Sequence, residues 1–116
     1  MTSDYATALR VLLARSSPQL EDSHRVEFKR CFGAVAAYVD GAIFASCGKF
    51  GVALKLPADT LGSLFREADV LPLRYFAKGH VKREYAVIPE RITRDSVRFT
   101  GLVDNSLAYA LRTAPR

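Results

Sequence analysis

Apolar residues recur at helical spacing near the start, in the middle and at the end of the chain. In residues 4–14 most of them fall on one side of a 3.6-residue period, with Ser3 or Asp4 as the N-cap. A second segment opens at Pro57, and its spaced apolar residues are Leu61, Leu64, Phe65 and Ala68. The clearest periodicity spans residues 92–111, where one face holds Ile92, Phe99, Val103, Ser106 and Ala110. We therefore expect three amphipathic helices.

Between the first two helices the pattern is typical of strands joined by turns. Residues 31–39 are uncharged, rich in β-branched and aromatic side chains, and end at Asp40-Gly41. This pair favours a two-residue hairpin because both positions tolerate positive φ. We expect residues 43–47 to return as the second strand and residues 52–56 to form the third, with Lys55 on the face opposite Leu54.

A second hairpin is predicted between the middle and last helices. Its strands are residues 73–76 and 81–88, its turn is Lys78-Gly79-His80, and Pro89 closes it. Residues 16–29 read as a polar connector that begins at Ser16-Ser17-Pro18. The predicted order is α-βββ-α-ββ-α, a five-stranded, mainly antiparallel sheet with helices over one face, which is an α+β two-layer sandwich.

Length and composition fit one ordered domain over residues 1–116. Hydrophobic residues make up 49% of the chain and charged residues 25%, close to the average of soluble globular proteins. A chain of 116 residues leaves no room for a second domain of ordinary size. No uncharged run is long enough to cross a bilayer and the start lacks the features of a signal peptide, so a cytoplasmic protein without a membrane partner is expected.

Positive charge is concentrated in the last third of the chain. The net charge is +5, and residues 78–116 hold eight basic and four acidic residues. The candidate interaction surface comprises Arg91, Arg94, Arg98 and Arg112 on the polar face of the last helix, joined by Lys82 and Arg83 if the second hairpin lies beside it. One interpretation is weak, sequence-independent binding of nucleic acid. The other is a solvated helix face whose arginines pair locally with Glu90 and Asp95.

The sequence indicates no reaction centre. Its acidic residues are scattered, and His24 and His80 fall in the connector and at a hairpin tip, so no catalytic residues are expected. Neither histidine stands at finger-like spacing from a cysteine pair, so no metal or cofactor is expected either. Cys31 and Cys47 are interpreted as free thiols, although a disulfide between neighbouring strands is conceivable.

Several short motifs occur together in one order. They are Lys29-Arg30-Cys31-Phe32-Gly33, Tyr38-Val39-Asp40-Gly41, Val52-Ala53-Leu54-Lys55, Tyr75-Phe76 and Glu84-Tyr85-Ala86-Val87-Ile88-Pro89. Over roughly residues 26–89 the chain resembles the N-terminal domain of the TfoX/Sxy family, bacterial proteins linked to regulation of natural competence. The motif residues singled out are Phe32, Gly33, Asp40, Gly41, Lys55, Tyr85 and Pro89.

The resemblance implies a two-layer α+β fold similar to type III secretion chaperones, and it supplies no catalytic residues. Cys31 stands where many members have Met, and the chain ends where a competence regulator continues into a second, helical DNA-associated domain. We therefore expect a stand-alone first domain.

The expected function is that of a non-enzymatic regulatory or adaptor domain that acts through a protein partner. Low-specificity nucleic-acid binding by the basic C-terminal helix is the alternative. Self-association into a homodimer is also open, through a sheet face lined by Ala34, Ala36, Tyr38, Ala53 and Lys55. A different interpretation is that Ala34 and Ala36 let a helix approach closely.

Overall fold

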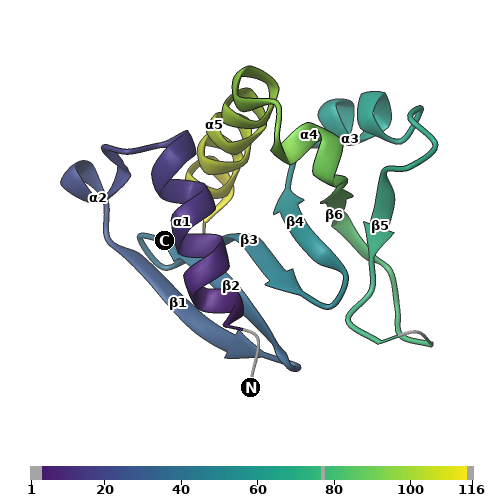
Figure 1. The fold of residues 1–116 in the computed structure, drawn as a ribbon, viewed down its shortest axis with the longest axis horizontal. Coiled ribbons are helices and arrows are strands. Elements are labelled where there is room, and N and C mark those ends of the chain that lie inside the picture. The colour runs from purple at the N-terminus through teal and green to yellow at the C-terminus, as the bar shows by residue number, and fades with distance from the viewer. Residues whose placement is uncertain (1–3, 77, 115–116) are drawn as a thin grey trace.

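A computed structural model, which describes residues 4–76 and 78–114, has a six-stranded antiparallel sheet with helices packed on it (Figure 1). The strands are β1 (Val26–Cys31), β2 (Ala34–Val39), β3 (Ala42–Gly48), β4 (Gly51–Lys55), β5 (Leu71–Leu73) and β6 (Lys82–Ile88). Their order in the sheet is β1-β2-β3-β4-β6-β5. The helices are α1 (Tyr5–Ser16), α2 (Leu20–Ser23), α3 (Ala58–Leu64), α4 (Glu90–Thr93) and α5 (Ser96–Thr113). The predicted α+β class is confirmed, but the predicted count of five strands is wrong.

The sixth strand, β1, begins in residues 16–29, which were predicted to be a polar connector and also contain α2. The strand predicted over residues 31–39 is shorter, because Cys31 ends β1 and β2 begins only at Ala34. The charged side chains of β1, Glu27, Lys29 and Arg30, hide the apolar alternation that identifies a strand. Such charges suit its position, because β1 is an edge of the sheet. The turn from β1 to β2 is Phe32-Gly33, with φ of 50° and 78°. The predicted Asp40-Gly41 turn is present between β2 and β3 and has similar φ values, 48° and 85°.

The predicted final helix, residues 92–111, is two helices. α4 ends at Thr93, and α5 begins after Asp95, whose carboxylate accepts a hydrogen bond from the Arg98 N–H at 3.1 Å. This N-cap starts a new helix. The apolar spacing continues across the break because Ile92 and Phe99 are buried in the same core.

The second hairpin also differs from the prediction. Its first strand is β5, at residues 71–73, so Tyr75 and Phe76 lie in the loop between β5 and β6. In α3, Leu61 and Leu64 are buried as predicted, whereas Phe65 caps the helix and Ala68 lies beyond it. The actual element order is therefore α-α-ββββ-α-ββ-α-α.

The core lies between the sheet and the two long helices, α1 and α5, which cross one face of the sheet (Figure 1). α1 contributes Leu9 and Leu13, α5 contributes Phe99, Val103 and Leu107, and the sheet contributes residues such as Val39, Phe44 and Leu54. Within the described part of the chain, no helix is both long and apolar enough to span a membrane.

A β-bulge in β3 joins the sheet to α5. Ala37 of β2 pairs with Ala45 and Tyr38 pairs with Ile43, so Phe44 is an extra residue without a partner in β2. The Phe44 side chain is fully buried in the core. The Phe44 carbonyl accepts a hydrogen bond from the buried Ser106 hydroxyl of α5 at 2.8 Å.

The strand register assigns the small residues to the two faces of the sheet. Ala36 and Ala53 both pair with Ser46, whereas their neighbours Ala37 and Leu54 belong to the core under the helices. Residues directly opposite one another in antiparallel strands share a face, so Ala36, Ser46 and Ala53 lie on the face away from α1 and α5. This arrangement opposes the interpretation that Ala36 lets a helix approach.

Candidate interaction surfaces

The arginines predicted to form a basic surface are largely engaged in ion pairs. Arg91 holds Asp69, with Nε 2.6 Å from Oδ2, and also contacts Glu67, with Nη2 2.9 Å from Oε1. Arg98 binds the same Glu67 carboxylate, with Nη1 3.0 Å from Oε1. Two arginines and two carboxylates therefore join the start of α5 and α4 to the connection between α3 and β5. We call this group the Glu67 cluster (Glu67, Asp69, Arg91 and Arg98).

The other predicted cations do not belong to the Glu67 cluster. Arg94 pairs with Glu90 one helical turn earlier, as one interpretation of the sequence expected. Arg112, in the last turn of α5, lies over the Tyr109 ring at 5.5 Å from its centroid. Lys82 and Arg83 are exposed at the start of β6. The sequence could not indicate the acidic partners in the Glu67 cluster, because they precede the arginines by 22 to 31 residues.

The Glu67 cluster is expected to make stability depend on pH. The hydrogen bonds from Arg98 and then Arg91 lower the pKa of Glu67 from 4.5 to about 2. Because the pKa is lower in the folded state, the charged carboxylate stabilises the fold above about pH 4.5, and this contribution is lost as the pH falls toward 2. In urea unfolding, Glu67→Gln should therefore have a lower free energy of unfolding than the wild type at pH 7. The difference between the two proteins should become smaller below pH 4.5.

The control for this experiment is Glu21→Gln, at an exposed position in α2. It should unfold like the wild type at each pH, because no ion pair joins Glu21 to another described residue. If the difference in free energy of unfolding between the wild type and Glu67→Gln stayed constant from pH 7 to pH 2, the lowered pKa of Glu67 would be contradicted.

The predicted motif residues serve the architecture. Phe32-Gly33 and Asp40-Gly41 are turns in which both residues have positive φ, and Lys55 faces Tyr85 across β4 and β6. Pro89 is the N-cap of α4. Asp40 also anchors the chain before β1, because its carboxylate accepts the Arg25 N–H at 2.8 Å and contacts His24 Nδ1 at 2.6 Å. The His24 and Arg25 hydrogen bonds lower the pKa of Asp40.

The face of the sheet away from the helices carries a group of tyrosines. Tyr38 and Tyr85 belong to this face by register, and the Tyr75 hydroxyl reaches Ser46 Oγ at 3.4 Å from the loop between β5 and β6. Burial is the main cause of the raised pKa of Tyr75 and of Tyr85. Ala36 and Ala53 are fully buried here, so the centre of this face is not open to a large partner.

Aromatic side chains from three separate turns meet at one end of this face. Phe32 follows β1, Phe50 follows β3, and Tyr75 and Phe76 follow β5. The ring centroids are 5.4 Å apart for Phe32 and Tyr75, 5.6 Å for Phe32 and Phe76, and 5.7 Å for Phe50 and Tyr75. The sequence analysis missed this cluster because its members are distant in sequence and Tyr75-Phe76 was predicted to be a strand.

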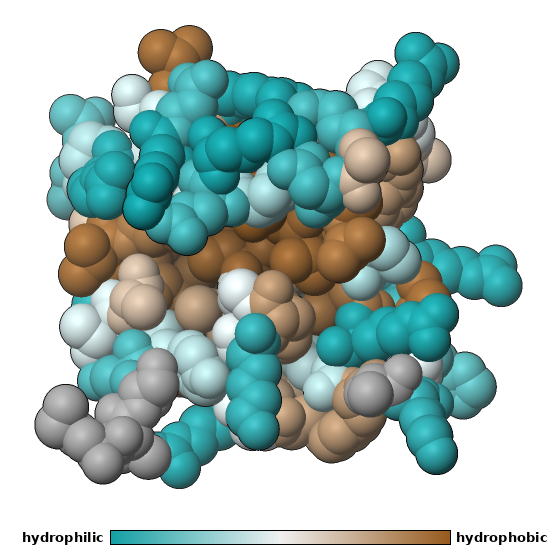
Figure 2. All heavy atoms as spheres, turned by 45° about the vertical axis from the view of Figure 1, so that its right-hand side comes forward, coloured by the Kyte–Doolittle hydropathy of each residue, from teal (hydrophilic) through white to brown (hydrophobic). Residues whose placement is uncertain are grey.

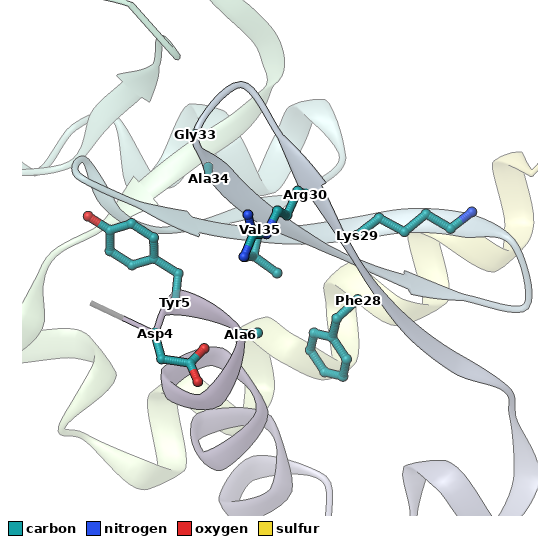
Figure 3. A pocket seen from close by; sticks show the side chains of 9 residues that line it. All are labelled: Asp4, Tyr5, Ala6, Phe28, Lys29, Arg30, Gly33, Ala34 and Val35. Carbon is teal, nitrogen blue, oxygen red and sulfur yellow. The ribbon is translucent and has the colours of Figure 1, made fainter. Parts of the chain in front are cut away.

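Two hollows adjoin the aromatic cluster. One, of about 520 Å³, is lined by Tyr5, Phe32, Gly33, Ala34, Lys49, Phe50, Arg74, Tyr75 and Phe76. The other, of about 800 Å³, lies between the first turn of α1 and the β1–β2 hairpin (Figure 3). It shares Tyr5, Gly33 and Ala34 with the first, and Arg30 adds a further cation to its lining. The Lys29 side chain points away from this hollow, and its amine lies 4.9 Å from the centroid of the Tyr38 ring (Figure 3).

The remaining candidate groups do not assemble into a reaction centre. Cys31 and Cys47 are both free thiols, and burial raises the pKa of Cys47. Among residues 4–76 and 78–114, no three or more His, Cys, Asp or Glu side chains gather in a way that would hold a metal ion. His24 is engaged with Asp40, and His80 lies exposed in the loop before β6.

Comparison with known protein families identifies the fold. The model of the TfoX N-terminal domain matches residues 18–110, which is most of the chain. The chain belongs to this family. The match contains all the motif residues from which the sequence resemblance was drawn, and the open antiparallel sheet with helices on it is consistent with a TfoX N-terminal domain. No curated protein and no solved structure matches the chain.

TfoX N-terminal domains are a non-catalytic regulatory domain family, and this membership supports a regulatory or adaptor domain. The six strands, including the charged edge strand β1, all lie within the matched residues.

Proposed function

We propose that this TfoX N-terminal domain is a non-enzymatic regulatory or adaptor domain that acts by binding a protein partner in the bacterial cytoplasm. Membership of the family supports the regulatory role, and we propose competence regulation as that role because the sequence resembles the TfoX/Sxy proteins. The observation that supports a protein contact is an exposed apolar surface near α3 and β5.

This surface, which we call the α3–β5 patch, is defined by Phe65 and Leu71. Their side chains are large and apolar, and they are 40% and 57% exposed. Figure 2 brings this side of the molecule forward and shows an apolar band between two polar regions. Exposed apolar surface with a polar rim is typical of protein interaction sites. We propose that the partner covers the patch with an apolar surface of its own.

The proposal can be tested by placing a charge in the patch. Phe65→Asp and Leu71→Asp should each abolish binding of the partner, because a carboxylate buried in the interface without a counter-charge opposes association. The measurement is chemical cross-linking in extract of the native cell, followed by quantitative mass spectrometry and by a direct binding assay with the purified candidate. Size-exclusion chromatography with light scattering identifies a second copy of the chain as the partner.

The matched control is Val97→Asp, which introduces the same charge at an apolar side chain of α5 that is 83% exposed. A protein that is lost with both patch variants, retained with the control and bound directly by the wild type supports the proposal. Equal binding by all four proteins refutes it.

The alternative, weak nucleic-acid binding through the basic C-terminal helix, has less support. Arg91, Arg94 and Arg98 already pair with carboxylates, so their charges are largely compensated. A phosphate would have to displace these internal partners.

A further inference from the structure

We propose that the turn end of the sheet binds single-stranded nucleic acid. This surface, the turn surface, comprises Phe32, Lys49, Phe50, Arg74, Tyr75 and Phe76. It is distinct from the α3–β5 patch and from the arginines of α4 and α5, so its test is independent of the proposed function.

The first supporting observation is the exposure of aromatic rings. Phe32 is 63% exposed and Phe76 is 59% exposed, although their ring centroids are only 5.6 Å apart. Tyr75 and Phe50 are partly buried beside them and hold the cluster together. Aromatic rings displayed on a fixed support are the usual platform on which unpaired bases stack.

The second observation is the charge around the rings. The hollow of about 520 Å³ is lined by Lys49 and Arg74 and by no acidic residue. Neither cation forms an ion pair with another described residue, in contrast to the arginines of the Glu67 cluster. Lys82 adds a further amine, 6.0 Å from the centroid of the Tyr75 ring. Uncompensated cations beside exposed rings match the two parts of a nucleotide, its phosphate and its base.

The third observation is that the cationic lining continues past the cluster. The adjoining hollow of about 800 Å³ adds Arg30 of β1, and its one acidic residue is Asp4. The Asp4 carboxylate is engaged as the N-cap of α1, where it accepts the Thr7 N–H at 3.0 Å. The two hollows therefore offer a track of positive charge along which a phosphate backbone can run.

The geometry favours a single strand over a duplex. Stacking on a side chain requires a base whose face is free, and in a duplex those faces are covered by neighbouring base pairs. Every base has a π face, so the surface should bind strands of different sequence with similar affinity.

Fluorescence anisotropy with the full chain tests this proposal. The probes are a labelled 20-nucleotide oligo-dT, a single-stranded RNA of the same length and a labelled 20-bp duplex, each at about 50 and about 200 mM salt. We expect saturable binding of both single strands, tighter than that of the duplex and weaker at the higher salt. Phe32→Asn should weaken single-strand binding by at least about fivefold through loss of stacking. Asn tolerates the positive φ of this turn position, so the substitution preserves the backbone.

The role of the cations is tested with two double variants that have the same change in net charge. Lys49→Gln with Arg74→Gln should lower the slope of log K against log salt by about 0.7 for each phosphate contact removed. Arg94→Gln with Arg112→Gln, at the C-cap of α4 and in the last turn of α5, should leave affinity and slope unchanged. Any one of the following results would overturn the proposal: no saturable binding at about 50 mM salt, duplex binding as tight as single-strand binding, or equal losses in the two double variants. Displacement of the oligonucleotide by poly-glutamate at equal charge would also overturn it, because it would assign the surface to acidic protein chains.

Discussion

Replacing Phe44 with alanine is expected to lower the free energy of unfolding by about 3 to 5 kcal/mol. Phe44 is fully buried between the sheet and α5, so the shorter side chain leaves a cavity in the core as well as losing its own burial. A domain of this size has a total stability of about 5 to 15 kcal/mol, so this loss leaves the fold marginal. Urea unfolding followed by circular dichroism measures the change.

Two further variants distinguish the cavity from other causes. Phe44→Leu keeps most of the volume and should cost less than Phe44→Ala. Phe65→Ala removes the same ring from a side chain that is 40% exposed, and it should cost far less. Similar losses for Phe44→Ala and Phe65→Ala would show that Phe44 is not part of the central core.

The second large effect is expected at Ser106, where alanine should cost about 1 to 3 kcal/mol. The Ser106 hydroxyl is fully buried and donates to the Phe44 carbonyl at 2.8 Å. Phe44 is the extra residue of the bulge and has no partner in β2, so removal of the hydroxyl leaves a buried carbonyl without its donor. Thermal and urea unfolding of Ser106→Ala give the size of the effect.

Ser96→Ala is the control, because it makes the same chemical change at an exposed position of the same helix. It should unfold within about 0.5 kcal/mol of the wild type. If Ser106→Ala were equally neutral, the hydrogen bond across the bulge would contribute nothing to the fold.

The sequence indicated those elements whose signals are local. Asp40-Gly41 identified its hairpin because the pair carries positive φ by itself, and Leu61 and Leu64 marked the buried side of α3. The edge strand β1 was missed because its alternate residues are charged, and a strand with one partner needs little apolar surface. Asp95 was interpreted as a partner for arginine, although an aspartate before a helical segment is also a typical N-cap.

The candidate surfaces depended on contacts that no local pattern reports. The arginine spacing along the last helix was recognised, but the carboxylates that compensate Arg91 and Arg98 come from the connection between α3 and β5. The turn surface arises because β1 and β3 run in the same direction, so that Phe32 and Phe50 follow them at one end of the sheet, and the loop after β5 carries Tyr75 to these two rings. Such clusters follow from strand order, and the strand order was not available until β1 had been found.

The two outer strands limit how copies of this chain can associate. β5 has three residues, and its central Pro72 lacks the amide hydrogen that a further strand would need. The opposite edge, β1, presents Lys29 and Arg30, which repel the same strand of a second copy. Continuous cross-β polymerisation is therefore disfavoured at both edge strands. The protein should not aggregate through its sheet edges at high concentration, even though apolar side chains are exposed elsewhere.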